Sequence, residues 1–202
     1  MNQPFTIRSF SVRKRCKPMR DFDFHTHRPD TPAGSGIVCL PKAVVLDADA
    51  ARWTPVPGGL YAAGIHPWWT QDADFSLAAY LRGLERLLEY PEVVQLGECG
   101  LDRLRGAAMA EQLSVFRAQA ELSERLAVPM TLHCVRAFDL ILQARKAWHP
   151  RQTWTIHGFR GGPALAEQLL RAGCDLSFGP RHNAEAWNLT PENRRYRETD
   201  AE

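Results

Sequence analysis

The chain has 202 residues, of which 45% are hydrophobic and 24% are charged, and its formal net charge is +2. This composition fits a single globular domain with a substantial core. The near balance of charge excludes a broad basic surface of the kind that coats nucleic acids or anionic membranes. The sequence has no apolar stretch long enough to cross a bilayer, so no membrane contact is expected.

The first 20 residues differ from the rest in charge. They carry six basic side chains and no acidic one, namely Arg8, Arg13, Lys14, Arg15, Lys17 and Arg20. A secretory signal would place an apolar run behind such charges, and none follows here. We predict that residues 1–20 form a disordered basic extension and that residues 21–202 form the folded domain. A transit-like or nucleic-acid-contacting arm is the alternative.

The number and spacing of the cysteines indicate whether the protein resides in an oxidising or a reducing compartment. There are five, and they are far apart: Cys16, Cys39, Cys99, Cys134 and Cys174. Their odd number and the lack of a Cys-x-x-Cys pair argue against a disulfide framework, so we expect free thiols and a cytoplasmic protein. Cys99 and Cys134 each follow a candidate site residue. Strand alternation turns their side chains away from that residue, which predicts small core residues.

The first predicted strand, at 22–25, lies within the sequence FDFHTH. In an extended strand alternate side chains point to the same side, so Asp23, His25 and His27 would share one face. Two neutral imidazoles side by side suit a metal ion. A solvated strand end whose histidines do no chemistry is the alternative, and this short stretch is compatible with both.

Strand-like and helix-like segments alternate along the rest of the chain. Strand-like segments follow within 37–40 or 44–46, within 58–69, and at 93–102, 129–134, 153–159, 174–179 and 194–200. Apolar residues at helical spacing, with proline or glycine at their ends, predict helices at 75–90, 107–127, 137–147 and between Pro163 and Gly173.

This alternation predicts an α/β fold with a parallel sheet and right-handed crossovers. About eight such units close into a (β/α)8 TIM-type barrel, here a small one. The chain stops two residues after the eighth predicted strand. The helix that would cover that strand is therefore expected to be lacking.

Acidic and histidine side chains recur where the predicted strands end. The set comprises His25, His27, His66, Glu98, Asp102, His133, His157 and Asp200. The carboxyl ends of barrel strands form one rim, where barrel enzymes hold their reacting groups. Each residue alone has an ordinary alternative role, such as a hydrogen-bonded histidine or a capping aspartate. Their shared placement predicts a metal site at this rim.

The same motifs resemble those of a known family. DFHTH, GIHP, LGECGLD, PMTLHC, IHGFRGG, DLSFG and ETDA have the order and spacing of the TatD family of metal-dependent hydrolases, within the amidohydrolase superfamily. The resemblance covers residues 21–202. It implies a barrel that holds two divalent ions through six side chains: His25, His27 and Asp200 on one ion, His133 and His157 on the other, and Glu98 between them.

The resemblance also implies an activity. Members of the family mostly hydrolyse phosphodiester bonds in DNA, often as 3′-exonucleases, so DNA or another phosphodiester is the expected partner. A water activated by two ions would be the nucleophile, and Asp200 would take its proton. Glu98 and Asp200 are therefore the expected catalytic residues. Imidazole ligands favour Zn2+ or a similar ion such as Mn2+, whereas Mg2+, which the family also uses, prefers oxygen ligands.

Two further functions stand as alternatives. The same centre on another member of the superfamily would hydrolyse an amide, ester or lactone, or act as a deacylase, because a fold and a metal site do not fix the substrate. A degenerate, non-catalytic protein is the third hypothesis. The complete set of six ligand side chains argues against it.

The resemblance names two substrate contacts. Family members meet phosphate near the GIHP motif and through an arginine after the strand-five histidine, which implies His66 and Arg136 here, although Arg136 stands one position later than in the family. Trp68 and Trp69 follow the same motif. They would either stack a base or pack against the barrel.

Overall fold

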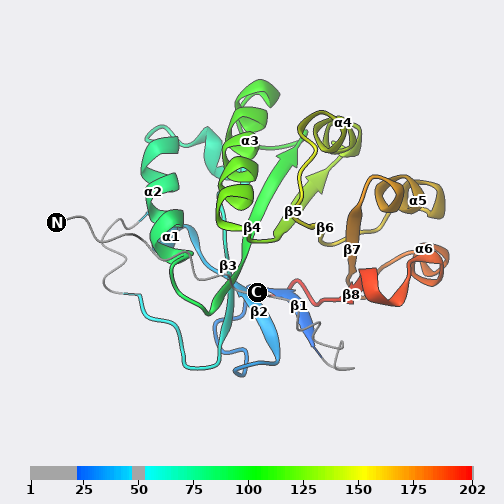
Figure 1. The fold of residues 1–202 in the computed structure, drawn as a ribbon, viewed down its shortest axis with the longest axis horizontal. Coiled ribbons are helices and arrows are strands. Elements are labelled where there is room, and N and C mark those ends of the chain that lie inside the picture. Colours follow the sequence, from blue (N-terminus) through cyan, green and yellow to red (C-terminus); the bar gives the residue numbers. More distant parts are fainter. Residues whose placement is uncertain (1–21, 47–52, 202) are drawn as a thin grey trace.

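A computed structural model describes residues 22–46 and 53–201 (Figure 1). The predicted basic extension, residues 1–20, lies outside the described residues. Each strand pairs in parallel with the next one along the chain. The strands are β1 (Asp23–Thr26), β2 (Gly36–Cys39), β3 (Leu60–Ala63), β4 (Val93–Asp102), β5 (Met130–Val135), β6 (Trp154–Ile156), β7 (Cys174–Phe178) and β8 (Arg195–Arg197).

Helices connect most successive strands and lie outside them (Figure 1). They are α1 (Lys42–Leu46), α2 (Leu77–Leu87), α3 (Met109–Leu126), α4 (Phe138–Trp148), α5 (Pro163–Arg171) and α6 (Ala184–Leu189), with short 3-10 helices η2 (Pro67–Gln71) and η3 (Glu192–Arg194). Among the described residues, none of the helices combines the length and the apolar character that a membrane span requires.

The last strand returns to the first. The His27 N–H donates to the carbonyl of Ala201 at 2.8 Å, and the Asp200 N–H donates to the carbonyl of His25 at 3.1 Å. Phe24 of β1 stacks on Tyr196 of β8, with ring centroids 4.3 Å apart. These contacts join both ends of the eight-stranded sheet, so the predicted barrel is confirmed. The described residues after β8 contain no helix.

Two elements differ from the expectation. The segment 44–46, one alternative for the second strand, lies in α1, and the other alternative is β2. Helix α6 was not predicted. It is only six residues long, and the Asn183 side chain caps it by accepting the Ala186 N–H at 3.0 Å. A helix this short carries no sustained apolar period, so its local cap was the only available signal.

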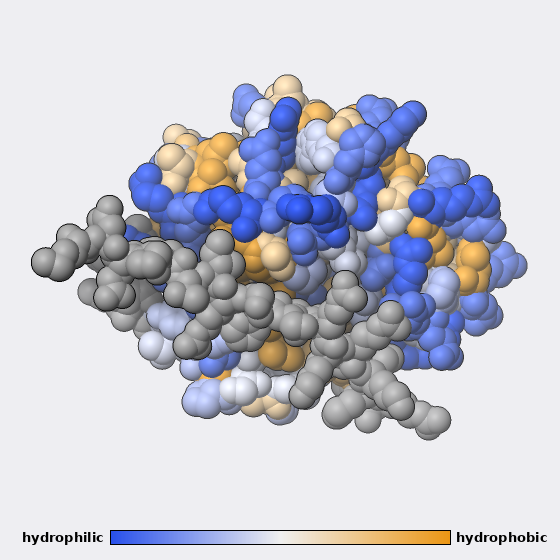
Figure 2. Space-filling model, viewed as in Figure 1, coloured by the Kyte–Doolittle hydropathy of each residue, from blue (hydrophilic) through white to orange (hydrophobic). Residues whose placement is uncertain are grey.

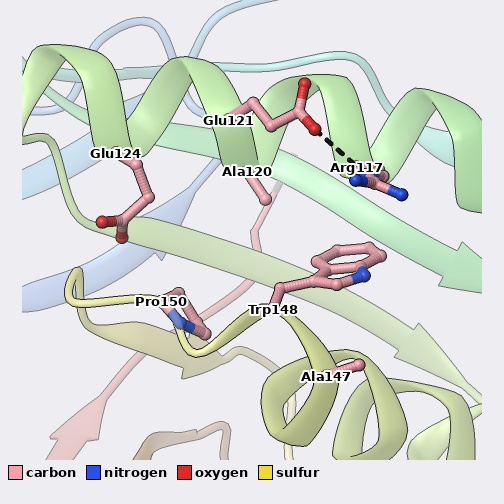
Figure 3. A pocket seen from close by; sticks show the side chains of 7 residues that line it. All are labelled: Arg117, Ala120, Glu121, Glu124, Ala147, Trp148 and Pro150. Atoms are coloured by element: carbon pink, nitrogen blue, oxygen red, sulfur yellow. Dashed lines mark hydrogen bonds and ion pairs between the residues drawn. The ribbon is translucent and has the colours of Figure 1, made fainter.

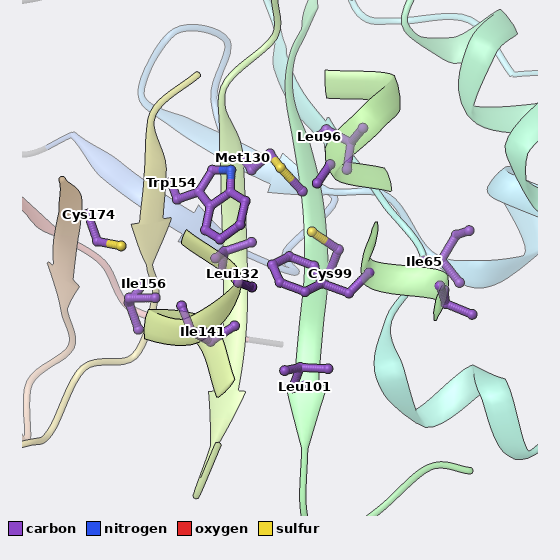
Figure 4. Packing of buried hydrophobic residues seen from close by; sticks show 14 of the residues in the cluster. Ile65, Leu96, Cys99, Leu101, Met130, Leu132, Ile141, Trp154, Ile156 and Cys174 are labelled. Atoms are coloured by element: carbon purple, nitrogen blue, oxygen red, sulfur yellow. The ribbon is translucent and has the colours of Figure 1, made fainter. Parts of the chain in front are cut away.

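The apolar core fixes where the strand ends lie. Leu132 of β5, Trp154 of β6 and Ile141 of α4 are fully buried in one cluster (Figure 4). Burying each such side chain contributes about 1.5–3 kcal/mol. Cys99 belongs to the same cluster and Cys134 packs against it, as predicted. On the face in Figure 2, hydrophilic residues cover most of the described surface and hydrophobic ones form small patches.

Gly100 is expected to be essential for β4–β5 pairing. Its φ is +134°, and a Cβ at this position would lie 2.1 Å from the carbonyl oxygen of His133. Gly100→Ala must therefore adopt a strained backbone and push two paired strands apart, and we expect a loss of about 2 kcal/mol or more in unfolding free energy. Urea denaturation measures it. Gly162→Ala is the control, because a Cβ there meets nothing within 4 Å, and equal stability of both variants would contradict the account.

Candidate metal centre

Glu98 of β4 lies at the middle of the predicted site. Its side chain is buried, with 6% of its surface exposed. One carboxylate oxygen, Oε1, lies 2.6 Å from Nδ1 of His133 and 2.7 Å from Nε2 of His157. These histidines come from β5 and from the residue directly after β6. Three neighbouring strands thus bring two imidazoles onto one carboxylate oxygen.

The other oxygen of Glu98 faces the first strand. Oε2 lies 3.4 Å from Nε2 of His25 and 3.5 Å from Nε2 of His27. The two imidazole nitrogens are 3.3 Å apart. One carboxylate therefore stands between the first-strand histidines on Oε2 and the histidines of the β5 and β6 side on Oε1.

Asp200 completes the six predicted side chains. Its Oδ1 lies 3.8 Å from Nε2 of His25 and 3.7 Å from Nε2 of His27. The side chain is 40% exposed, and the backbone has φ of +50°, which is rare for a residue other than glycine. The hydrogen bond from the Asp200 N–H to His25 holds this conformation. A strained residue that reaches both the centre and solvent is typical of a functional position.

The charges at the centre favour cations. Burial disfavours the ionised form of Glu98, but the charge of His157 and the hydrogen bonds of His133 and His157 outweigh it and hold the pKa of Glu98 well below its usual range. Burial likewise lowers the pKa of His157, yet the carboxylates of Glu98 and Glu198 raise it well above its usual value. Positive charge is thus stabilised where a divalent ion would bind.

The donor set fits metal ions. Within the described residues three groups of ligand atoms each lie within 4.8 Å of one another: His25–His157–Asp200, His25–Cys39–Glu98 and His66–Glu98–His133. Imidazole, carboxylate and thiol donors suit Zn2+ and related ions. These groups overlap, and one of them joins His157 to the first-strand side rather than to His133.

Two of the donors were not predicted as ligands. His66 was predicted to contact substrate phosphate, and its Nε2 lies 3.3 Å from Oε1 of Glu98, inside the centre. The sulfur of Cys39 accepts the Glu98 N–H at 3.3 Å, and burial raises the pKa of the Cys39 thiol above its usual range. Cys39 is the last residue of β2, and this position at a strand end was the available signal.

Two further carboxylates contact the ring nitrogens of His133 and His157 that face away from Glu98. Oδ2 of Asp102 lies 3.1 Å from Nε2 of His133. Oε1 of Glu198 lies 3.6 Å from Nδ1 of His157 and accepts the Gly158 N–H. Such carboxylates orient an imidazole and raise its basicity as a ligand. Asp102 was noted at the rim but given no role. Glu198 was missed, although alternation in the strand predicted at 194–200 would put it on the same side as Asp200.

Asp102→Asn is expected to weaken metal binding. It removes the charge behind His133 and leaves the side chain volume almost unchanged, and loss of such a partner typically costs about 10–100-fold in metal affinity. Competition titration with a chelating indicator measures this. The control is Asp139→Asn, since Asp139 forms a surface ion pair with Arg103 in an adjacent loop. Unchanged affinity of Asp102→Asn would contradict the supporting role.

The remaining predicted contacts lie around the rim. Arg136 follows β5, is exposed, and accepts a hydrogen bond from Arg103 on its carbonyl. Trp69 packs in the core, where it stacks on Tyr80 with centroids 5.8 Å apart. Trp68 stays 37% exposed. Trp69 thus follows the packing alternative, and base stacking by Trp68 stays a prediction.

A separate hollow of about 390 Å³ lies between α3 and the end of α4 (Figure 3). It is lined by Arg117, Ala120, Glu121, Glu124, Ala147, Trp148 and Pro150. Arg117 and Glu121 close one side with an ion pair of 3.0 Å. None of the candidate metal ligands contributes to it, so its shape has no bearing on the chemistry of the centre.

The chain is similar in sequence to a known protein family and to several named proteins. The family model described as TatD related DNase matches residues 49–201. A protein named 3'-5' ssDNA/RNA exonuclease TatD from Erwinia billingiae (strain Eb661) is 38% identical over 150 residues, which are 69% of this chain and 56% of that protein. The protein of the same name from Erwinia amylovora is 36% identical over the same shares. The chain spans little more than half the length of these relatives.

Two solved structures are also similar. YJJV, a TatD homologue from Escherichia coli K12, superposes with a TM-score of 0.59 at 29% identity, over 79% of this chain and 68% of that one. A hydrolase TatD family protein from Entamoeba histolytica superposes with a TM-score of 0.61 at 22% identity, over 82% and 60%. The second likeness supports the barrel fold alone.

Proposed function

Because the chain belongs to the TatD related DNase family, we propose that it is a metal-dependent phosphodiesterase that removes nucleotides from the 3′ end of single-stranded DNA or RNA. The names of its relatives suggest the bond and the substrate. The observation that carries the proposal is the position of Glu98, whose Oε2 faces His25 and His27 while its Oε1 faces His133 and His157, with His66 beside them. This is what a carboxylate that bridges two cations requires.

The proposed ligands are the six side chains expected from the sequence. His25, His27 and Asp200 would hold one ion and His133 and His157 the other, with Glu98 shared. The split of Glu98 contacts between its two oxygens supports this division. Bound divalent ions would act as Lewis acids and would lower the pKa of a bound water to near neutral pH. Zn2+ and Mn2+ suit the imidazoles better than Mg2+ does.

The chain's own residues handle the proton and the substrate. The Asp200 side chain is exposed enough to meet a water, so it would accept the proton of the attacking water at a carboxylate oxygen and later return it to the leaving oxygen. Glu98 keeps its charge throughout, since its low pKa prevents protonation. His66 and Arg136 are the proposed phosphate contacts. Free thiols at all four described cysteines support a cytoplasmic location as part of this proposal.

A substrate panel tests the proposal. The metal-loaded protein is incubated with 3′-overhang DNA, single-stranded RNA, bis-p-nitrophenyl phosphate and a series of carboxylic esters, amides and lactones, with chelator-treated protein as the control. We expect phosphodiester turnover that disappears with chelator. Turnover of esters, amides or lactones alone would instead support the hydrolase or deacylase alternative, and bound metal without any turnover would support a non-catalytic protein.

Metal affinity is expected to rise with pH well above 6.5. The pKa of His157 lies well above that usual value, so its imidazole stays protonated there and an ion must displace the proton. Isothermal titration with Mn2+ from about pH 6 to pH 9 measures both the affinity and the protons released. An affinity that is already constant above pH 6.5 would contradict this assignment.

A further inference from the structure

Trp68 combines exposure with closeness to the centre. It lies in η2, which follows β3 after three residues, and its ring meets the His66 ring edge-on at a centroid distance of 4.7 Å. The ring of His133 is 5.8 Å away in the same edge-on manner. The Trp68 Nε1–H donates to Oδ2 of Asp102 at 2.6 Å. Trp68 is thus held against two histidines of the centre while 37% of it remains exposed.

The loop after β4 adds apolar and cationic groups beside this ring. The Arg105 guanidinium lies over the Trp68 ring, 4.3 Å from its centroid. Leu104 is 61% exposed. The N–H groups of Leu104 and Arg105 donate to Oδ1 of Asp102, at 2.7 and 3.2 Å. Asp102 therefore organises this loop with one oxygen and holds Trp68 and His133 with the other.

The exposure of these groups belongs to a fixed structure. The buried Gln112 amide donates to the carbonyls of Arg105 and Ala107, at 2.8 and 2.9 Å. The Ala107 N–H donates to Oγ1 of Thr70, at 2.9 Å, which ties the loop to η2. The loop and η2 form one hydrogen-bonded unit, so the exposed side chains are held in place rather than left at a frayed end.

Exposed large hydrophobic side chains are uncommon in the described part of the chain: Val56, Trp68, Leu104 and Leu126. Two of these four lie in segments that a hydrogen bond joins beside the centre, namely Trp68 in η2 and Leu104 in the loop after β4. An aromatic ring with an arginine beside it is the usual platform for a single-stranded nucleic acid, because every base has a π-face and every linkage has a negative phosphate.

We propose that Trp68, with Arg105 beside it, stacks the nucleobase next to the scissile phosphate and so positions a single-stranded 3′ end in the metal centre. This rests on the proposed exonuclease function. Arg105 covers the ring in the free protein and moves onto the backbone phosphate, or onto the outer face of the base, when the strand binds. Trp68 is a positioning residue, since it touches the base and no reacting atom.

Matched oligonucleotides test the platform. One ends in a normal 3′ nucleotide and the other in an abasic sugar with the same phosphate, and kcat and KM are measured for both. We expect the protein to prefer the normal end by about tenfold or more in kcat/KM, which corresponds to about 1.4 kcal/mol. The preference should lie mainly in KM. Trp68→Ala should abolish it, whereas Trp68→Phe, which keeps a ring, should retain most of it.

The ratio of kcat/KM between the two substrates distinguishes loss of base stacking from damage to the metal centre. Loss of the Trp68–Asp102 hydrogen bond would slow both substrates equally, so only a change in their ratio reports stacking. Leu126→Ala is the matched control, because Leu126 is also 37% exposed but lies at the end of α3. A native chain without preference, or a Trp68→Ala variant that keeps it, would overturn the proposal.

Failure of the exonuclease function has a different signature. If no oligonucleotide is cleaved, binding of the same two fluorescent strands is measured by anisotropy with metal present. Tighter binding of the normal end that depends on Trp68 would still support the platform, and equal binding would overturn it. A Trp68→Ala variant that changes only the oligomeric state in sedimentation would also overturn it, because the patch would then serve protein association.

Discussion

Glu98→Gln is expected to lower the proposed nuclease activity by about 10³-fold or more while the barrel stays folded. The neutral amide cannot balance two cations, and it presents one oxygen and one NH2 group where the wild type presents two charged oxygens. The loss is on the scale of removing a group that stabilises charge in the transition state. Single-turnover rates on 3′-overhang DNA measure it, together with metal content per chain.

The metal content should fall below two ions per chain in Glu98→Gln. Glu121→Gln is the control, since Glu121 is an exposed glutamate of α3 that pairs with Arg117 of the same helix. It should keep both activity and metal. A Glu98→Gln variant with normal turnover and normal metal content would remove Glu98 from the proposed centre.

Asp200→Asn is expected to separate proton transfer from metal binding. The amide oxygen can still face an ion, whereas the group can no longer accept a proton, so kcat should fall by about 10²–10⁴-fold. Metal content should stay close to that of the unmodified protein. Activity and metal content are measured on the same preparations.

The comparison variant for Asp200 is Asp30→Asn. Asp30 pairs with Arg28 at the surface, close to the first-strand histidines in sequence, and its side chain is 69% exposed. This variant should behave like the unmodified protein. If Asp200→Asn kept full kcat, the proton acceptor would have to be another group.

Much of the fold followed from sequence alone because barrel strands and helices alternate with clear signals. The strand at 93–102 coincides with β4, and Pro163 begins α5 as expected. Strand ends were less well predicted. The strand expected at 153–159 corresponds to β6, which has only three residues. The backbone beyond Ile156 still forms hydrogen bonds, but they lie outside the regular strand pairing. The pattern of apolar residues does not indicate where regular pairing stops.

The candidate site was predictable where a residue type has a strong chemical preference. His25 lies next to the end of β1, whereas Glu98 and His133, which were expected to end their strands, lie inside β4 and β5. Parallel topology still brings the carboxyl-terminal parts of such strands to one rim. Cys39 was not predicted as a candidate ligand, because a small buried cysteine is usually a core residue. The double role of Asp102 depends on which atoms face His133 and Trp68. Only three-dimensional placement reveals that.

The most direct test of the account locates the ions themselves. Crystals grown with Zn2+ or Mn2+ are measured at the absorption edge of the metal, and anomalous difference maps are inspected around Glu98. The account predicts two peaks, one beside each carboxylate oxygen, with His25 and His27 on one and His133 and His157 on the other. Peaks elsewhere, or no peak near Glu98 in excess metal, would contradict it.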